Sequence, residues 1–235
     1  MIVSHEHQFI FIKTRKTAGT SIEVTLSKEC GLRDIITPIQ KIDEEIRSNL
    51  GHRGPQNYKI TKNRLFDNLR NLLGFKPQEH YNHSPAKLIR ERIGDSDFNS
   101  YLKFCVVRNP WDRAVSEYYW LLNGPGKDRW PEGKTFGEFI QESKADLLSD
   151  SHIYTIDGKS AIDRFIKYEN LDAELNECLK EIGISNVELP RTKSGTRNSK
   201  AHYSLLFDDE SIKKITEICS WEILNLGYEF EDKRN

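Results

Sequence analysis

The sequence predicts a single α/β domain with a mostly parallel central sheet flanked by helices. Short apolar runs alternate with helical patterns along the chain, as strands and crossover helices do in a parallel sheet. Two apolar runs, 9–12 and 102–107, end in polar, basic turns that lead into helices. A length of 235 residues suits one domain with a buried core, so we expect that domain to span 1–235.

The first strand is predicted at 9–12, where the chain is apolar without interruption. The helix that follows begins at Thr17 or Gly19. It runs to Cys30, because apolar residues recur at helical spacing and Gly31 stands just after it.

The rest of the chain continues this alternation. The run at 102–107 predicts another buried strand, and the Asn-Pro dipeptide after it begins a helix that ends near Leu122. Asp157-Gly158 is a turn signal between two short strands within 154–166. A further strand is expected within 33–39, and further helices at 62–73, 85–93, 136–143, 170–182 and 208–226.

Composition argues against several classes of protein. Lys and Arg total 35 and Asp and Glu total 36, for a net charge of −1, whereas a nucleic-acid-binding protein is usually clearly basic. Residues 1–8 lack an apolar signal region and no stretch is long enough to cross a bilayer, so we expect no membrane partner and a cytoplasmic location. The 4 cysteines form no CxxC pair, which disfavours a zinc knuckle.

The turn after the first strand has the features of an anion site. A strand-to-helix turn exposes backbone N–H groups at the positive end of the helix dipole. Ala18 and Gly19 are small enough for a phosphate to approach the backbone, and Lys16 adds a mobile charge. The same residues also fit an ordinary helix N-cap by a threonine, so this turn alone leaves both interpretations open.

The turn after the 102–107 strand strengthens the first interpretation. Arg108 ends that strand, and an arginine can bind a phosphate through two parallel hydrogen bonds. Ser116 follows about two helical turns later and could share the same phosphate. Two such turns at the carboxyl ends of strands indicate one ligand with two anionic ends.

Other functions remain open at this point. The nucleotide-triphosphate loop GxxxxGK[ST] is absent, because Lys16 precedes Gly19 instead of following the last glycine. No acid-ended strand that would hold magnesium is evident. A P-loop-like small-metabolite kinase is therefore disfavoured but not excluded. A non-catalytic module that binds a nucleotide or polyanion is the other alternative.

The two turns together resemble the motifs of the P-loop-like sulfotransferases, which use 3′-phosphoadenosine 5′-phosphosulfate (PAPS). Residues 16–21 are similar to that family's 5′-phosphosulfate loop, and residues 108–116 to its 3′-phosphate motif. Arg15 departs from the pattern, since many members have proline before the lysine. Weaker similarities lie at 81–84, 164–171, 202–203 and 227–230.

The resemblance implies a P-loop NTPase-like sulfotransferase fold and a reaction. The sulfuryl group would pass by in-line displacement to a hydroxyl or amine of a small-molecule or sugar acceptor, leaving adenosine 3′,5′-bisphosphate (PAP), with no metal. Lys16 would stabilise the leaving group, and His83 would be the general base. His80 is the alternative base, and a surface or capping role for His83 also stays open.

The resemblance also implies a set of cofactor-binding residues. In the acid-free stretch 190–200, Arg197 or Lys200 is expected to close over the nucleotide. The oligomeric state is not predicted. The full set comprises Arg15, Lys16, Thr17, Ala18, Gly19, Thr20, Ser21, Arg108, Ser116, Arg197 and Lys200.

Overall fold

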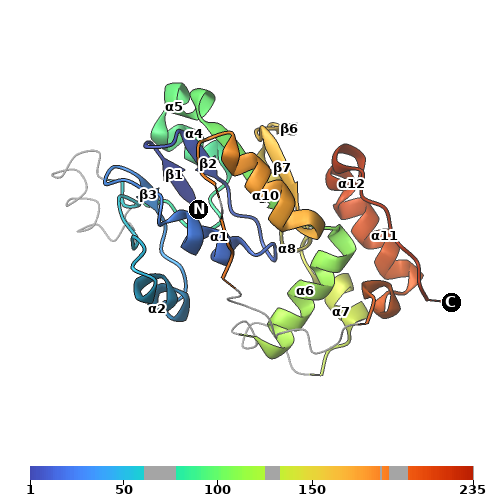
Figure 1. The fold of residues 1–235 in the computed structure, drawn as a ribbon. Coiled ribbons are helices and arrows are strands. Elements are labelled where there is room, and N and C mark those ends of the chain that lie inside the picture. The colour runs from blue at the N-terminus through green and yellow to red at the C-terminus, as the bar shows by residue number, and fades with distance from the viewer. Residues whose placement is uncertain (61–77, 125–132, 186, 191–200, 235) are drawn as a thin grey trace, which may run out of the picture.

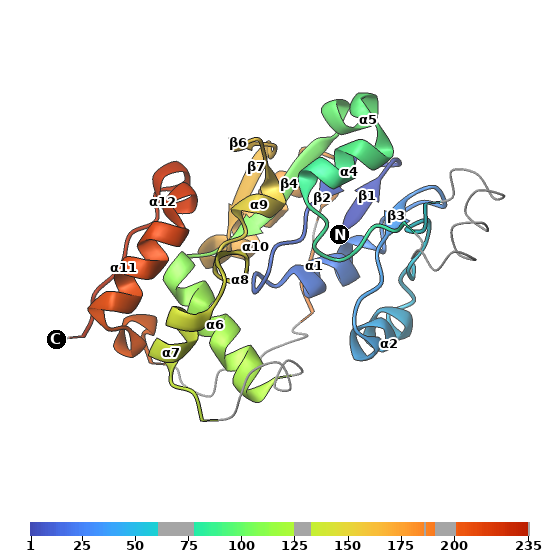
Figure 2. The same cartoon turned by 180° about the vertical axis from the view of Figure 1, so that it is seen from behind.

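The computed structural model describes residues 1–60, 78–124, 133–185, 187–190 and 201–234. Figure 1 shows a central sheet with helices on both faces, and Figure 2 shows it from behind. The α/β class and the flanking helices are therefore confirmed. The helix predicted at 62–73 and the basic residues Arg197 and Lys200 lie outside the described residues.

The sheet has five strands in the spatial order β3-β1-β2-β4-β7. They are β1 (Ile2–Ser4), β2 (Phe9–Phe11), β3 (Ile35–Ile36), β4 (Leu102–Val107) and β7 (Arg164–Lys167). β2, β4 and β7 pair in parallel, whereas β1 is antiparallel to both β2 and β3. The prediction of a mostly parallel sheet is confirmed, with β1 as the exception, because the short turn from β1 to β2 can join only antiparallel strands.

Helices cover the sheet and continue to one side of it, where α6, α7, α11 and α12 gather (Figure 1). In the part of the chain that the structure describes, no helix is both long and apolar enough to span a bilayer. The described helices are α1 (Gly19–Leu26), α2 (Lys41–Asn49), α4 (Ala86–Ile93), α5 (Asp95–Ser100), α6 (Pro110–Asn123), α7 (Phe136–Glu142), α8 (Ala145–Leu148), α9 (Ser151–Tyr154), α10 (Leu171–Lys180), α11 (Asp209–Ile218) and α12 (Ser220–Leu226).

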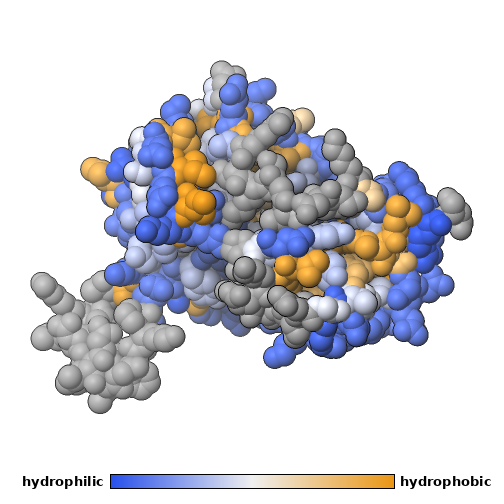
Figure 3. Space-filling view, turned by 90° about the horizontal axis from the view of Figure 1, so that it is seen from below, coloured by the Kyte–Doolittle hydropathy of each residue, from blue (hydrophilic) through white to orange (hydrophobic). Residues whose placement is uncertain are grey.

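Both faces of the sheet are buried, because successive residues along a strand point to opposite sides. Phe9, Phe11 and Phe104 pack together on the face covered by α1 and α10. Ile10 and Cys105 belong to the core on the other face, which includes residues of α4 and α6. This two-sided burial explains why the strands read as continuous apolar runs. On the surface shown in Figure 3, apolar residues lie in separate patches among hydrophilic ones.

Several predicted elements match the structure closely. The strand predicted at 102–107 is β4, and the helix after it begins at Pro110. The predicted turn joins the hairpin strands β5 (Thr155–Ile156) and β6 (Lys159–Ser160), with φ of 50° at Asp157 and 77° at Gly158. β1, α2, α5, α8 and α9 were not predicted. Apart from α2, each spans six residues or fewer, too short for a periodic pattern to stand out.

Two predicted helices end differently in the structure. The helix predicted at 208–226 is divided into α11 and α12 at Cys219, whose buried thiol donates to a backbone carbonyl of α8. α1 stops short of Cys30, because the Ser27 hydroxyl donates to the Val24 carbonyl at 2.6 Å and ends the regular helix.

Candidate functional site

The two basic turns lie side by side, because β2 and β4 are neighbouring parallel strands whose carboxyl ends meet at one edge of the sheet. The Arg108 guanidinium donates through Nη1 to the carbonyl oxygen of Lys16 at 2.9 Å. Both turns open onto one cavity of about 910 Å³. Its lining includes Lys13, residues 14–21, Asn82, His83, Arg108, Ser116, Glu117, Trp120, Leu147, Tyr168, Glu169 and Asp172.

The first turn holds a shape that few residues other than glycine adopt. Lys16 and Ala18 have φ of 60° and 58°, in the left-handed region. The Thr14 and Thr17 hydroxyls lie 2.8 Å apart, and the Thr14 hydroxyl donates to the Val106 carbonyl on β4. The Thr17 hydroxyl is therefore used inside the loop, so any contribution of Thr17 to a bound anion falls to its backbone N–H group.

A buried ion pair lies beneath the start of α1. Lys13 Nζ is 2.5 Å from the carboxylate of the fully buried Glu23, which also contacts the amino group of Met1. Burial alone would raise the pKa of Glu23, but the charges of Lys13 and Met1 lower it to about 2. A Cβ atom at Gly19 would stand 2.7 Å from Lys13 Cγ, so this position has room only for glycine.

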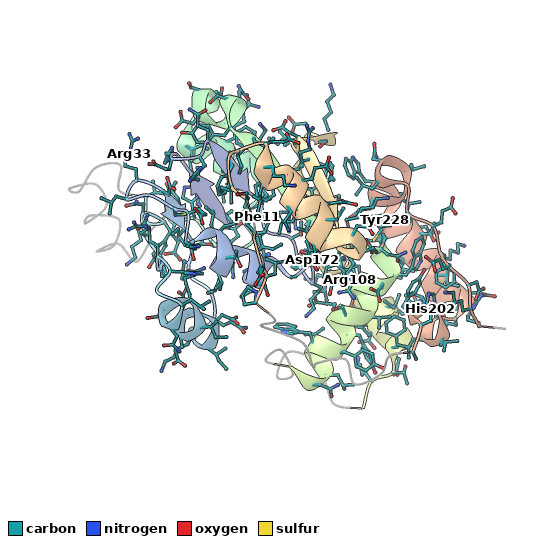
Figure 4. All side chains as sticks on the ribbon, viewed as in Figure 1. Phe11, Arg33, Arg108, Asp172, His202 and Tyr228 are labelled. Atoms are coloured by element: carbon teal, nitrogen blue, oxygen red, sulfur yellow. The ribbon has the colours of Figure 1, made fainter. Side chains whose placement is uncertain are left out.

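Arg108 is fixed on three sides. Its guanidinium pairs with Asp112 at 2.6 Å, donates to the Lys16 carbonyl, and lies 4.3 Å from the ring centre of Tyr168. The Asn109 side chain accepts from two backbone N–H groups at the start of α6 and so caps that helix. Figure 4 labels Arg108 and Asp172 near the centre of the view, and both line the cavity.

Distant parts of the chain support this second turn. The Asn109 backbone N–H donates to Glu169 at 2.7 Å, and the Tyr228 hydroxyl donates to the same carboxylate at 3.4 Å. The Asn109 side chain also donates to the Tyr203 hydroxyl at 3.5 Å and to the Glu229 carbonyl at 3.3 Å. The stretches at 164–171, 202–203 and 227–230 therefore converge behind Arg108.

His83 lines the cavity, and one of its ring nitrogens already makes a hydrogen bond. Its Nδ1 lies 2.9 Å from the Lys13 carbonyl, which can only accept, so Nδ1 carries the proton and Nε2 keeps a lone pair. Burial and the nearby Lys13 charge lower the pKa of His83 from 6.5 to about 4, so the ring is neutral near pH 7. His80 is buried, is absent from the cavity lining, and has its pKa lowered to about 4 by burial.

A second buried charge cluster anchors the loop from the other side. The Asp150 carboxylate accepts from the Arg15 backbone N–H at 2.8 Å and from Arg15 Nε at 2.7 Å. Arg113 of α6 lies 3.8 Å from the same carboxylate. Burial alone would raise the pKa of Asp150, but the charges of Arg113 and Arg15 hold it below its ordinary value. Arg15 thus connects the loop to α6 through Asp150.

The structure places Arg15, Lys16, Ser21, Arg108 and Ser116 at one cavity, together with the loop residues between them. Sequence reasoning missed Glu117, which lines the same cavity and follows Ser116 on α6. Helical spacing from Ser116 points to positions three and four residues further along, so it gave no signal for Glu117. Within the described ranges, no group of three or more His, Cys, Asp or Glu side chains is arranged to hold a metal ion.

Comparisons with known proteins agree with this geometry. The family model described as "Sulfotransferase family" matches residues 1–229. An uncharacterized protein of Archaeoglobus fulgidus is 29% identical over 111 residues, which is 43% of this chain and 82% of that protein. The crystal structure of mouse sulfotransferase SULT7A1 complexed with PAP has a TM-score of 0.50 and 14% sequence identity, covering 94% of this chain and 86% of that one. At that identity the match shows the fold alone.

Gly19→Ala should destabilise the protein. The added Cβ would meet Lys13 Cγ at 2.7 Å and push it away from Glu23, so we expect a loss of about 1–3 kcal/mol, typical of overpacking. Urea denaturation measures this loss. Gly137→Ala in α7 is the matched control, because its new Cβ meets its nearest neighbour at 3.4 Å. Equal stabilities of the two variants would contradict the close packing at Gly19.

Asp150→Asn should also destabilise the protein, because it leaves the buried Arg113 and the half-buried Arg15 without their shared carboxylate. Breaking a buried pair from one side typically costs about 3–5 kcal/mol. Thermal and urea unfolding measure the change. Asp95→Asn removes a charge that is paired with Arg90 at the surface and should cost less than about 1 kcal/mol. A loss at Asp150 no larger than at Asp95 would show that this cluster does not anchor the loop.

Proposed function

This chain belongs to the sulfotransferase family, and we propose that it transfers the sulfuryl group of PAPS to a hydroxyl or amine of a small-molecule or sugar acceptor. The observation that carries the proposal is the hydrogen bond from Arg108 to the Lys16 carbonyl, which joins two cationic turns at one cavity. The mouse sulfotransferase of similar fold was solved with PAP, which supports the same nucleotide here. We propose that residues 1–235 act as one sulfotransferase domain.

Each turn is suited to one end of the donor. The backbone N–H groups of residues 17–21 stand at the start of α1, where they and the hydroxyls of Thr20 and Ser21 can hold the 5′-phosphate. Arg108 and Ser116 line the same cavity and can hold the 3′-phosphate. The closing role proposed for Arg197 or Lys200 stays a prediction.

The reaction follows from what lies next to the donor loop. The acceptor oxygen forms a bond to sulfur while the bond from sulfur to the bridging phosphate oxygen breaks, so PAP departs with the bonding electrons. In this proposal Lys16 stabilises the charge on that oxygen, and the reaction uses no metal. His83 Nε2 has the lone pair to take the acceptor proton.

Lys16→Ala and Arg108→Ala should have different effects. Lys16→Ala should lower turnover by about 10²–10³-fold, as the loss of one transition-state contact does, with little effect on PAP affinity. Arg108→Ala should weaken PAP binding by about 10–100-fold, because it removes charge-assisted hydrogen bonds. Calorimetric titration with PAP and steady-state turnover of PAPS measure the two effects.

The reverse pattern would show that the two roles are exchanged. Titration with ATP and magnesium on the unmodified chain is the control for a small-metabolite kinase. Tighter binding of ATP than of PAP would overturn the sulfotransferase proposal. Binding of PAP without transfer to any acceptor would favour the non-catalytic alternative.

The pH dependence of kcat/KM should reflect the protonation of His83. Its lowered pKa of about 4 keeps the ring neutral, and therefore able to accept a proton, well below pH 6.5. Activity should fall only as the pH drops toward that value, so the acid limb of kcat/KM should lie nearer pH 4 than 6.5. His83→Gln should lower kcat/KM by about 10²–10⁴-fold and remove this limb. An unchanged profile in His83→Gln, with loss of activity in His80→Gln instead, would move the base to His80.

A further inference from the structure

One buried acid in the cavity has no role in the reaction described above. Glu117 follows Ser116 on α6, lines the cavity, and has only 4% of its surface exposed. Among the described residues, its carboxylate makes no hydrogen bond and no ion pair within 4.0 Å. A buried carboxylate is ordinarily paired, because an uncompensated charge is costly in a low-dielectric setting. Within the described part of the chain, no charged group stands within ion-pair distance of Glu117 where it lines the cavity.

The charges around Glu117 show which sign of partner it needs. Burial raises the pKa of Glu117, and the positive charge of Lys16 is the largest influence that opposes this. The neighbouring Arg113 and Arg15 are shared with the Asp150 carboxylate. When the donor binds, its phosphosulfate group competes for Lys16. Glu117 would then face a polyanion with less opposing charge than before.

Trp120 offers an aromatic ring on the same helix as Glu117. It lies one helical turn further along α6 and lines the same cavity. Lys16 Nζ stands 5.2 Å from the centre of its ring, so an ammonium group already rests against this aromatic face. A carboxylate next to an indole face is the combination that attracts an organic cation. The two side chains stand about one turn apart on the same helix, within reach of a single ammonium group.

We propose that Glu117 and Trp120 bind a protonated amine on the acceptor, so that the substrates of this chain are amine-bearing alcohols or phenols. The inference rests on the proposed function, because it identifies the acceptor half of that same cavity. A protonated amine has no lone pair and cannot attack sulfur. The hydroxyl of the same molecule is therefore the group that is sulfated, and its proton passes to His83.

The test compares matched pairs that differ only in the charge of the amine. Tyramine and N-acetyltyramine form one pair, and glucosamine and N-acetylglucosamine form the other. Their affinities are measured by calorimetry on the full chain saturated with PAP, and their turnover is then measured with PAPS. In at least one pair the free amine should bind about tenfold tighter, the usual strength of a hydrogen bond to a charged group.

Glu117→Gln should abolish this preference while leaving the affinity for the N-acetyl member unchanged. Glu210→Gln, which removes an exposed acid on α11, should keep the preference. Trp120→Leu should reduce the preference several-fold and serves as the second variant if Glu117→Gln does not fold. Unfolding curves establish that each variant is intact.

Two results would overturn the inference. One is the absence of an amine preference in both pairs, and the other is a preference that persists in Glu117→Gln. A loss of turnover that is equal for both members of a pair would assign Glu117 to positioning Lys16 and would also overturn it. The proposed function is judged separately by PAP affinity, and the amine preference can be measured on the nucleotide-free chain if PAP does not bind.

Discussion

The hydrogen bond from the Arg108 guanidinium to the Lys16 carbonyl is the constraint on which the site depends. It holds the ends of two neighbouring parallel strands together, so that backbone donors at the start of α1 and cations at the start of α6 face one cavity. A guanidinium can do this and still offer donors to a ligand, because its N–H groups point in several directions. The Arg108 side chain thus joins the two turns and is also a candidate contact for an anion.

The cations around the cavity are balanced by carboxylates that lie behind them. Lys13 pairs with Glu23, Arg15 with Asp150, and Arg108 with Asp112. Each carboxylate belongs to a helix or loop that must be in its place for the pairing to form. These ion pairs therefore connect the turn after β2 to α1, to α6 and to the segment before α9. The ammonium group of Lys16 rests against the Trp120 ring, with its nitrogen 5.2 Å from the ring centre.

Support for the second turn comes from parts of the chain that are far away in sequence. Glu169, Tyr203 and Tyr228 converge on Asn109, and their hydrogen bonds orient the first turn of α6. Their shared purpose becomes visible only where the side chains meet. Glu169 orients Asn109 and also lines the cavity.

The sequence by itself determined what depends on neighbouring residues. It predicts the strand at 102–107, the helix that begins at Pro110 and the turn at Asp157, because periodicity, caps and turn residues act over a few positions. Tertiary structure decided where β1 pairs, which of His80 and His83 reaches the cavity, and which carboxylate holds each cation. It also decided that Glu117 is buried at the cavity wall. Burial and charge pairing join residues that are distant in sequence, so local patterns carry no information about them.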